Sequence, residues 1–296
     1  MGETAPKSSV PAQGAAPAAE QTSPTAGQTA PVAEQTPSGR EPLLEVDNVT
    51  LRFGGVVALD GVDFTLYKGE ILGLIGPNGA GKTTCFNAMT GIYQPTEGEI
   101  RFQGQRITGK KRHQITKLGM ARTFQNIRLF PEMTALENVQ VGADAHHKTS
   151  VISALFRLPR HWREEREGRE KAERLLEFVG IRDRIHEYAR NLSYGEQRRL
   201  EIARALATDP ALLCLDEPAA GFNPAEKEDL LQLIRRIRDT GVTILLIEHD
   251  MRLVMGVTDR IVVLEFGKKI AEGLPAEVRE DHRVIAAYLG VPDDAA

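Results

Sequence analysis

The stretch at residues 71–84, which reads ILGLIGPNGAGKTT, limits the possible folds of this chain more than any other. Its first five residues are apolar and mostly branched, as in a buried strand, and turn-forming residues follow directly. A helix is expected after the turn. The turn and the helix start match the pattern G-x-x-x-x-G-K-[ST], with Gly76, Gly81, Lys82 and Thr83 at its fixed positions.

The residue types in this loop suit a bound triphosphate. Glycines let successive backbone N–H groups close around phosphate oxygens, and the positive end of the helix dipole adds to the attraction. Lys82 is expected to reach the outer phosphates and the Thr83 hydroxyl to ligate Mg²⁺. A Gly-rich turn without a ligand is the alternative, but the flanking strand and helix favour nucleotide binding. The candidate cofactor-binding residues here are Gly76, Pro77, Asn78, Gly79, Ala80, Gly81, Lys82, Thr83 and Thr84.

The length and the charge of the chain limit the classes of function that it can have. The chain has 296 residues, 41% hydrophobic and 26% charged, enough for one large or two ordinary domains with a sizeable core. Its net charge is -4 and its pI is near 6.0, which gives no electrostatic reason to expect nucleic acid as a partner. The two cysteines, Cys85 and Cys214, are expected to be small buried side chains in a reducing compartment rather than redox or metal sites.

The hydropathy pattern and the N-terminal composition bear on location and domain bounds. No apolar run approaches the roughly 18 residues needed to cross a bilayer, and no signal peptide opens the chain. We therefore expect a cytosolic protein, which leaves docking on a membrane protein open. Residues 1–41 contain almost no large apolar side chains and are rich in Ala, Pro, Thr and Gln, which predicts a disordered tail.

Short strands precede the phosphate loop. Residues 42–70 alternate strand-like runs with turns at 54–55 and 68–69, as in an antiparallel group that leads into the phosphate-loop strand. Phe53 is predicted in the loop of the first hairpin, where an aromatic ring can stack on a nucleobase. Periodicity alone favours a core position for Phe53.

The segment after the phosphate loop continues with short elements. The helix at 83–91 is expected to end at its glycine, and a strand with a tight turn follows at 98–104. Another short strand is predicted at 122–125. Spacing alone makes Gln125 a solvated polar residue.

A mainly helical insertion is predicted at 133–191. Within it, residues 164–180 form an amphipathic helix that ends at a glycine, and its charges are expected to form a solvated face. Two i,i+4 pairs are predicted there, Glu167 with Lys171 and Glu170 with Arg174.

The next helix begins with a capping box. Ser193 and Glu196 are three residues apart ahead of an apolar run, and this structural role alone explains both residues. A Ser hydroxyl and the Gly195 N–H at a helix N-terminus also suit a bound phosphate. The two interpretations are compatible.

Polar residues follow two apolar strands further along the chain. The strand at 211–217 ends in Asp216 and Glu217, and because ligands of α/β sheets lie at the carboxyl ends of strands, this pair is a candidate Mg²⁺ and water site. Asp216 would hold the metal through water, and Glu217 would accept a proton from the attacking water. His249 follows the strand at 242–247, in the position of a phosphate-sensing imidazole, although a lone His is more often structural.

The chain ends with a further strand at 261–265, a turn at 266–267 and a helical stretch at 275–289. The motifs GPNGAGKTT, Gln125, LSYGEQRRLEIARAL, LLCLDEP and IEHD occur in the order found in ATP-binding-cassette ATPases, so residues 42–290 resemble that family. The resemblance implies an α/β fold: a P-loop NTPase-type parallel core sheet, an antiparallel β subdomain and a helical subdomain at about 126–192. A C-terminal hairpin and helix would occupy about 261–290.

The resemblance also implies residue roles. Phe53 would stack on adenine, and Lys82, Glu217 and His249, the switch histidine, would be catalytic. Thr83, Gln125 and Asp216 would hold or sense Mg²⁺, while Ser193 and Gly195 would form the signature that contacts ATP. The sequence departs from the usual family pattern at three positions, Tyr194, Glu196 and Asn223.

Three further segments resemble the ATP-binding subunits of high-affinity branched-chain amino acid importers: GMARTFQNIRLFPEMTALENV, DEPAAGFNPAE and IAEGLPAEVREDHRVIAAYLG. Similar subunits serve urea, short amides and lipopolysaccharide export, which remain alternatives. Such a subunit would bind ATP and Mg²⁺ in a head-to-tail dimer with an identical or paralogous cassette. It would lie on the cytoplasmic face of the cell membrane with two transmembrane permease subunits and an extracytoplasmic solute-binding protein.

Two rival functions come from other classes. Cassette ATPases that act on DNA or ribosomes usually carry a long coiled-coil insertion or two cassettes, whereas these motifs occur once and are closely spaced. A nucleotide-binding module without turnover is disfavoured by the intact pair Asp216 and Glu217.

Overall fold

The computed structural model describes residues 39–143 and 159–289, apart from the side chains of 159–164. The helices and strands discussed below belong to the unit that begins at Gly39. The predicted tail at 1–41 lies outside the described residues except for its last three. Of these three residues, Glu41 forms an ion pair with Lys68, with 2.5 Å between Oε1 and Nζ.

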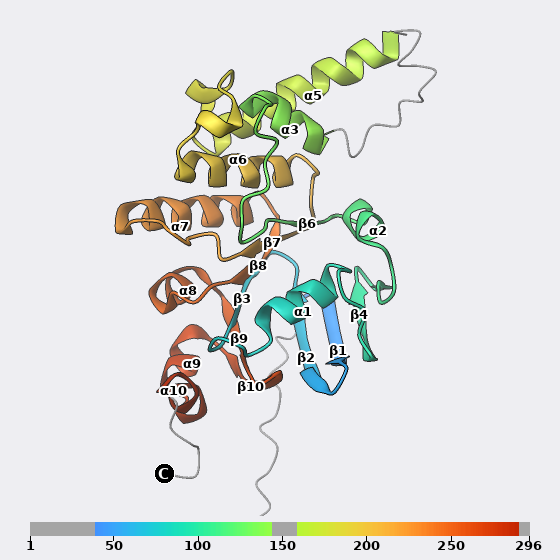
Figure 1. Ribbon diagram of the computed structural model, residues 1–296, viewed down its shortest axis with the longest axis vertical. Coiled ribbons are helices and arrows are strands. Elements are labelled where there is room, and N and C mark those ends of the chain that lie inside the picture. The colour runs from blue at the N-terminus through green and yellow to red at the C-terminus, as the bar shows by residue number, and fades with distance from the viewer. Residues whose placement is uncertain (1–38, 144–158, 290–296) are drawn as a thin grey trace, which may run out of the picture. The chain divides into compact units, whose positions relative to one another are not determined.

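A six-stranded sheet carries the phosphate-loop strand in its middle (Figure 1). In spatial order its strands are β10 (Lys268–Gly273), β9 (Arg260–Glu265), β3 (Ile71–Ile75), β8 (Thr243–Ile247), β7 (Leu212–Asp216) and β6 (Met120–Arg122). Only the pair of β10 and β9 is antiparallel. Every residue of β3, β7 and β8 is buried, which explains their almost uninterrupted apolar sequences.

The predicted strands of this sheet are found with small shifts. The strand predicted at 122–125 is wrong by three residues, because β6 ends at Arg122 and Gln125 lies in the following loop. The predicted turn at 266–267 is confirmed, since Phe266 and Gly267 have positive φ angles of 44° and 79°.

A second, antiparallel sheet packs on the helix that follows the phosphate loop. Its spatial order is β2 (Val56–Tyr67), β1 (Pro42–Phe53), β4 (Glu97–Phe102) and β5 (Gln105–Arg106). One hydrophobic cluster joins this sheet to α1 (Lys82–Met89) and to the six-stranded sheet. The predicted hairpin turn at 54–55 is confirmed, but Phe53 is the last residue of β1, paired with Val56, and not a loop residue.

The segment between β6 and β7 is mainly helical where the structure describes it. It comprises α3 (Ala135–Ala143), α5 (Pro159–Phe178), two short 3-10 helices at Arg182–Arg184 and Ala189–Asn191, and α6 (Tyr194–Leu206). These helices share a hydrophobic cluster with α7 (Pro224–Asp239), which lies beside α6 in Figure 1. The predicted helix at 164–180 corresponds to α5, and Gly180 beyond it is left-handed at φ 81°.

The ion pairs along α5 differ from those predicted. Among the residues of α5 whose side chains are described, Arg166 pairs with Glu170 at 4.0 Å and Arg169 with Glu173 at 3.0 Å, both at i,i+4. Glu170 is thus paired with Arg166, one turn before it, and not with Arg174, one turn after it. Lys171 reaches across to Asp209 at 2.5 Å and so ties α5 to the end of α6.

Four more helices complete the described part: α2 (Arg112–Lys117), α8 (Met251–Val257), α9 (Pro275–Glu280) and α10 (His282–Leu289). The helical stretch predicted at 275–289 is two helices, because Asp281 between them has an extended backbone with ψ 118°. Within the described ranges, no helix combines the length and the apolar character that a membrane span needs.

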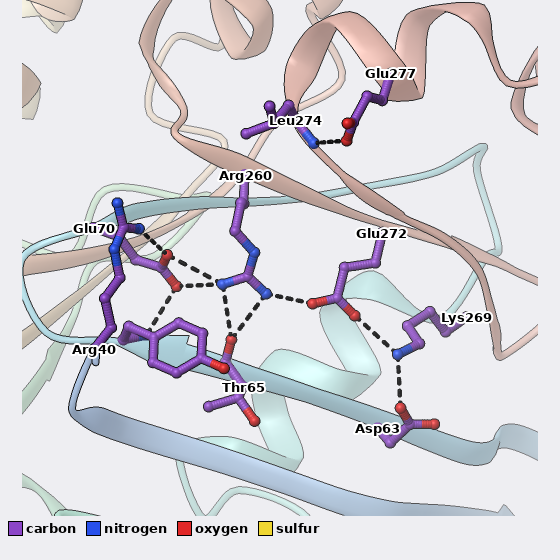
Figure 2. A network of polar contacts seen from close by, with 10 residues as sticks. Arg40, Asp63, Thr65, Glu70, Arg260, Lys269, Glu272, Leu274 and Glu277 are labelled. Atoms are coloured by element: carbon purple, nitrogen blue, oxygen red, sulfur yellow. Dashed lines mark hydrogen bonds and ion pairs between the residues drawn. The ribbon is translucent and has the colours of Figure 1, made fainter. Parts of the chain in front are cut away.

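Figure 2 shows an ion-pair network that joins the two sheets. Glu70, 2% exposed, accepts from Arg260 at 2.9 and 3.1 Å. Arg260 also pairs with Glu272, and Lys269 connects Glu272 at 2.9 Å to Asp63 on β2 at 2.6 Å. Burial raises the pKa of the Glu70 carboxyl, and a backbone N–H bond and Arg260 oppose that rise.

Removing Arg260 should therefore destabilise the fold far more than removing a surface cation. Arg260→Met leaves the buried Glu70 carboxylate facing Arg40 at 3.6 Å, and breaking such a pair costs about 3–5 kcal/mol. Lys68→Met, which breaks the exposed pair with Glu41, should cost at most about 1 kcal/mol. Urea unfolding compares the two variants.

A double variant, Glu70→Gln with Arg260→Met, removes both charges and should recover most of the lost free energy of unfolding. An Arg260→Met variant that is no less stable than Lys68→Met would show that the network does not hold the two sheets together.

Candidate active site

The phosphate loop is built around two glycines that no other residue can replace. Gly76 has φ 147°, and a Cβ there would lie 2.0 Å from the Leu264 carbonyl oxygen. Gly81 has φ 97°, and its Cβ would lie 2.9 Å from the Ala58 carbonyl oxygen. The loop therefore runs in contact with the backbones of β9 and β2, which fixes its position relative to both sheets.

Lys82 begins α1 and points back into the loop. Its ammonium donates to the carbonyl oxygens of Gly76 at 2.7 Å and Pro77 at 2.9 Å. Burial lowers the pKa of Lys82, and the nearby charge of Glu217 opposes this. Thr83 is exposed at the start of the helix, where the first N–H groups have no carbonyl one turn earlier to bond. The loop thus offers backbone donors, a cation and a hydroxyl at one point.

The end of β7 places Asp216 and Glu217 at the same sheet edge as the phosphate loop, because β3, β8 and β7 are parallel neighbours. Asp216 is 4% exposed and accepts from Arg122 at 2.8 Å. Arg122 in turn donates to Asn87 of α1 at 2.7 Å and to Thr90, the residue that follows α1, at 3.0 Å. The carboxylate at the end of β7 is therefore fixed to the helix that follows the loop.

Gln125 and His249 converge on Glu217. The Gln125 Nε2 donates to Glu217 Oε2 at 3.0 Å, and His249 Nδ1 lies 3.7 Å from the same oxygen. Glu217 has φ 45°, a left-handed backbone that is uncommon for its residue type and frequent at functional sites. Its N–H donates to the Ile247 carbonyl at 2.9 Å. The structure thus brings together three predicted site residues from three separate segments.

A buried ion pair on α6 holds the loop of Gln125. Arg198 and Glu201 pair at 2.7 Å with side-chain exposures of 0% and 1%. Arg198 donates to the carbonyl oxygens of Phe124 at 2.7 Å and Gln125 at 2.8 Å. Sequence reasoning missed this pair. Its signal was a charged pair at i,i+3 on the face of α6 that also carries the buried Ala205.

Glu248 is a second residue that the sequence analysis missed. It is 1% exposed and accepts from the N–H groups of Ala219 at 2.8 Å and His249 at 3.2 Å. The carboxylate therefore links the loop after Glu217 to the loop of the histidine. Burial raises the pKa of Glu248, and the bonds from these N–H groups oppose the rise.

Ser193 precedes α6, and Gly195 lies in the first turn of that helix. Figure 1 shows α6 well separated from α1. The predicted capping box is confirmed, because Ser193 Oγ accepts from the Glu196 N–H at 3.3 Å and Glu196 accepts from the Ser193 N–H at 2.8 Å. Within one chain, the signature residues therefore do not reach the phosphate loop.

The departures from the family pattern have structural roles. Tyr194 packs edge-on against Phe222, with ring centroids 6.2 Å apart. Asn223 caps α7 by accepting from the Glu226 N–H at 3.0 Å. Glu196 completes the capping box and pairs with Arg184 at 3.0 Å.

Phe53 is 45% exposed and makes an edge contact with Tyr93 at 5.0 Å between ring centroids. Periodicity favoured a core position for it, and this is wrong. An exposed ring at the hairpin end is free to stack on a flat ligand.

The predicted Mg²⁺ donors are the Thr83 hydroxyl, the Gln125 amide and the Asp216 carboxylate, all oxygen ligands of the kind Mg²⁺ prefers. The described residues contain no group of three acidic, His or Cys side chains that could cage a metal alone. This donor set fits an ion that is held partly by phosphate oxygens and water.

A glycine-rich phosphate loop beside strand-end carboxylates, in a parallel sheet with an antiparallel sheet and a helical part, defines a nucleotide-binding cassette. Comparisons with known proteins agree. The "ABC transporter" family model matches residues 59–220, and the "Branched-chain amino acid ATP-binding cassette transporter" model matches residues 268–294. The chain belongs to the ABC transporter family of ATP-binding cassettes, and the predicted fold class and ATPase family are confirmed.

The chain is similar over most of its length to individual members of this family. The high-affinity branched-chain amino acid transport ATP-binding protein BraF of Pseudomonas aeruginosa is 50% identical over 250 residues, covering 84% of this chain and 98% of BraF. The ADP conformation of MJ1267, an ATP-binding cassette of an ABC transporter, is 35% identical with TM-score 0.74, covering 84% and 99% of the two chains. A dimeric post-hydrolysis structure of the cassette MJ0796 bound to ADP and Pi is 26% identical with TM-score 0.67, covering 79% and 99%.

The two cysteines beside this site are buried, as predicted, and burial raises the pKa of each thiol to about 12. The folded protein should therefore not react with a thiol reagent such as DTNB at pH 8, whereas two thiols should react in guanidinium. Rapid modification of Cys85 or Cys214 in the folded chain would contradict this burial.

Proposed function

We propose that this chain is the ATP-hydrolysing subunit of an importer for branched-chain amino acids. The observation that carries the proposal is the convergence of Gln125 and His249 on Glu217, at the sheet edge that also holds the phosphate loop. The similarity to BraF and the match of the branched-chain family model to residues 268–294 support the substrate class. Urea or short-amide uptake and lipopolysaccharide export remain the alternatives within the family.

ATP would bind at residues 76–84, with its base on Phe53. The Lys82 ammonium would leave the carbonyl oxygens of Gly76 and Pro77, because a phosphate oxygen is a stronger partner for a cation in this buried position. Glu217 would orient the attacking water and accept its proton, while Gln125 and His249 hold the carboxylate and sense the outer phosphate.

Mg²⁺ would be held by Thr83, Gln125 and Asp216, and when bound it neutralises charge that develops on the phosphates. Asp216 would act through water, so its bond to Arg122 at 2.8 Å need not break. Arg122 instead keeps the carboxylate in one orientation.

A second cassette would complete the site. Figure 1 shows α6, which begins after Ser193 and contains Gly195, well separated from α1, so we propose that these two residues contact the ATP of a head-to-tail partner, identical or paralogous. The dimeric structure known for the similar cassette MJ0796 supports this arrangement. Closure on ATP and reopening after hydrolysis would supply the transport motion.

A groove of about 1060 Å³ between α2 and the helical part offers a docking site for a permease. Its cationic lining residues are Lys111, Arg112, Arg122, Arg128 and Arg204, and His113 also lines it. Among the lining residues that the structure describes, Glu201 is the single acid, and it is paired with Arg198. Exposed Phe130 and Val141 add an apolar part. We infer an acidic, partly apolar cytoplasmic segment of the permease as the occupant, which would place this subunit on the cytoplasmic face of the membrane.

Glu217→Gln should retain ATP binding but lose hydrolysis by about 10²-fold or more, because the amide cannot accept a proton from water. The variant should accumulate as an ATP-bound dimer, measured by gel filtration and phosphate release. Glu228→Gln, an exposed carboxylate change on α7, is the control and should hydrolyse normally. Wild-type turnover by Glu217→Gln would remove Glu217 from the role of base.

Arg112→Glu should reduce retention of the chain by its membrane subunits roughly tenfold, because it places a like charge against the proposed acidic segment. Lys117→Glu is the matched control, since Lys117 is exposed on the same helix but does not line the groove. Co-purification in detergent measures retention, and thermal melting checks that both variants fold. Equal retention of the two variants would place the permease elsewhere.

A further inference from the structure

The C-terminal helix reaches the phosphate loop through one tyrosine. Tyr288 lies on α10, and its hydroxyl oxygen accepts a hydrogen bond from the Gly76 N–H at 3.0 Å, across 212 positions of sequence. No motif in the sequence indicates a role for Tyr288. Gly76 is the first residue after β3, whose pairing with β8 and β9 ends at Leu74 and Ile75.

The Gly76 N–H needs such a partner. It is buried, and it lies beyond the strand ladder that would otherwise satisfy it, so a bond from outside the sheet is required. Its own carbonyl accepts from Lys82 at 2.7 Å. The peptide groups on either side of Gly76 are therefore held by Tyr288 and by the phosphate-loop lysine.

The helix that carries Tyr288 is itself fixed. Val278 of α9 and Val284 of α10 are 2% and 3% exposed in a hydrophobic cluster with Ile75, the last residue of β3. Asp281 accepts from the Arg283 N–H at 2.8 Å where α10 begins. Burial also raises the pKa of the Tyr288 hydroxyl, so it stays protonated at neutral pH. These contacts hold Tyr288 beside the phosphate loop.

We propose that Tyr288 is a positioning residue for the phosphate loop, through which α10 sets the affinity of this site for nucleotide. This inference rests on the proposed function, in which nucleotide binds at residues 76–84. When Lys82 leaves the Gly76 carbonyl for a phosphate, the bond from Gly76 N–H to Tyr288 remains and keeps that part of the loop in place. By thermodynamic linkage, the free energy by which the α10 contact strengthens nucleotide binding equals the free energy by which bound nucleotide stabilises that contact.

The test uses the full chain with Tyr288→Phe, which keeps the ring and removes the hydroxyl. Tyr288 is 38% exposed and the variant keeps its ring, so the variant should fold. The Kd for MgADP should rise about three- to tenfold, the range expected for one hydrogen bond. The KM for ATP should rise with it while kcat changes little, because the hydroxyl does not touch the reacting atoms.

Hydrogen exchange gives a second readout that a merely structural role would not move. In the wild-type chain, MgADP should slow amide exchange in α10 as well as in the phosphate loop, and Tyr288→Phe should lose the effect in α10 while retaining that in the loop. Ile285→Ala is the matched control, because Ile285 is 41% exposed on the same helix, and it should bind MgADP as the wild type does.

The outcomes test the role of Tyr288 separately from the proposed function. If the wild-type chain binds MgADP but Tyr288→Phe binds it equally well, Tyr288 does not position the loop and the proposed function stands. If Ile285→Ala weakens binding as much as Tyr288→Phe, the effect belongs to the helix in general and the assignment to the hydroxyl fails. If the wild-type chain binds no MgADP, the proposed function and this inference both fail.

Discussion

The parallel pairing of β3 with β8, and of β8 with β7, is the constraint on which the rest of the site depends. Parallel neighbours end at one edge of a sheet, so the residues after three strands meet there whatever their separation in sequence. The phosphate loop, Asp216 with Glu217, and His249 are brought together in this way. Every residue of the three strands is buried, so a slip by one residue would disturb side-chain packing on both faces of the sheet.

Charged side chains of the candidate site are held by partners within the chain. Lys82 is held by two loop carbonyl oxygens, and Arg122 is held by Asp216. Because these groups are buried, each would be costly to leave without a partner. In the proposed function, a phosphate oxygen would replace the loop carbonyl oxygens as the partner of Lys82, while Arg122 would stay paired with Asp216.

The sequence predicted those parts of the fold whose signals are local. The buried strands, the glycine-rich loop and the capping box of Ser193 and Glu196 each depend on residues within a few positions of one another, and all were found. The contact of Tyr288 with Gly76 and the bonds from Arg198 to the loop of Gln125 join distant segments, and no periodicity encodes them. Phe53 was misplaced because apolar periodicity cannot distinguish a core aromatic from an exposed one at a strand end.

Two of the three departures from the family pattern, Asn223 and Tyr194, show how a changed motif can keep its geometry. Asn223 accepts the Glu226 N–H as the first residue before α7, and an Asp at that position would accept the same bond, so the helix start does not depend on the exchange. Tyr194 adds a contact that a glycine cannot make, because its ring packs on Phe222 in the loop after Glu217. This ring contact links the N-terminal end of α6 to the loop that follows the candidate base Glu217 within the same chain.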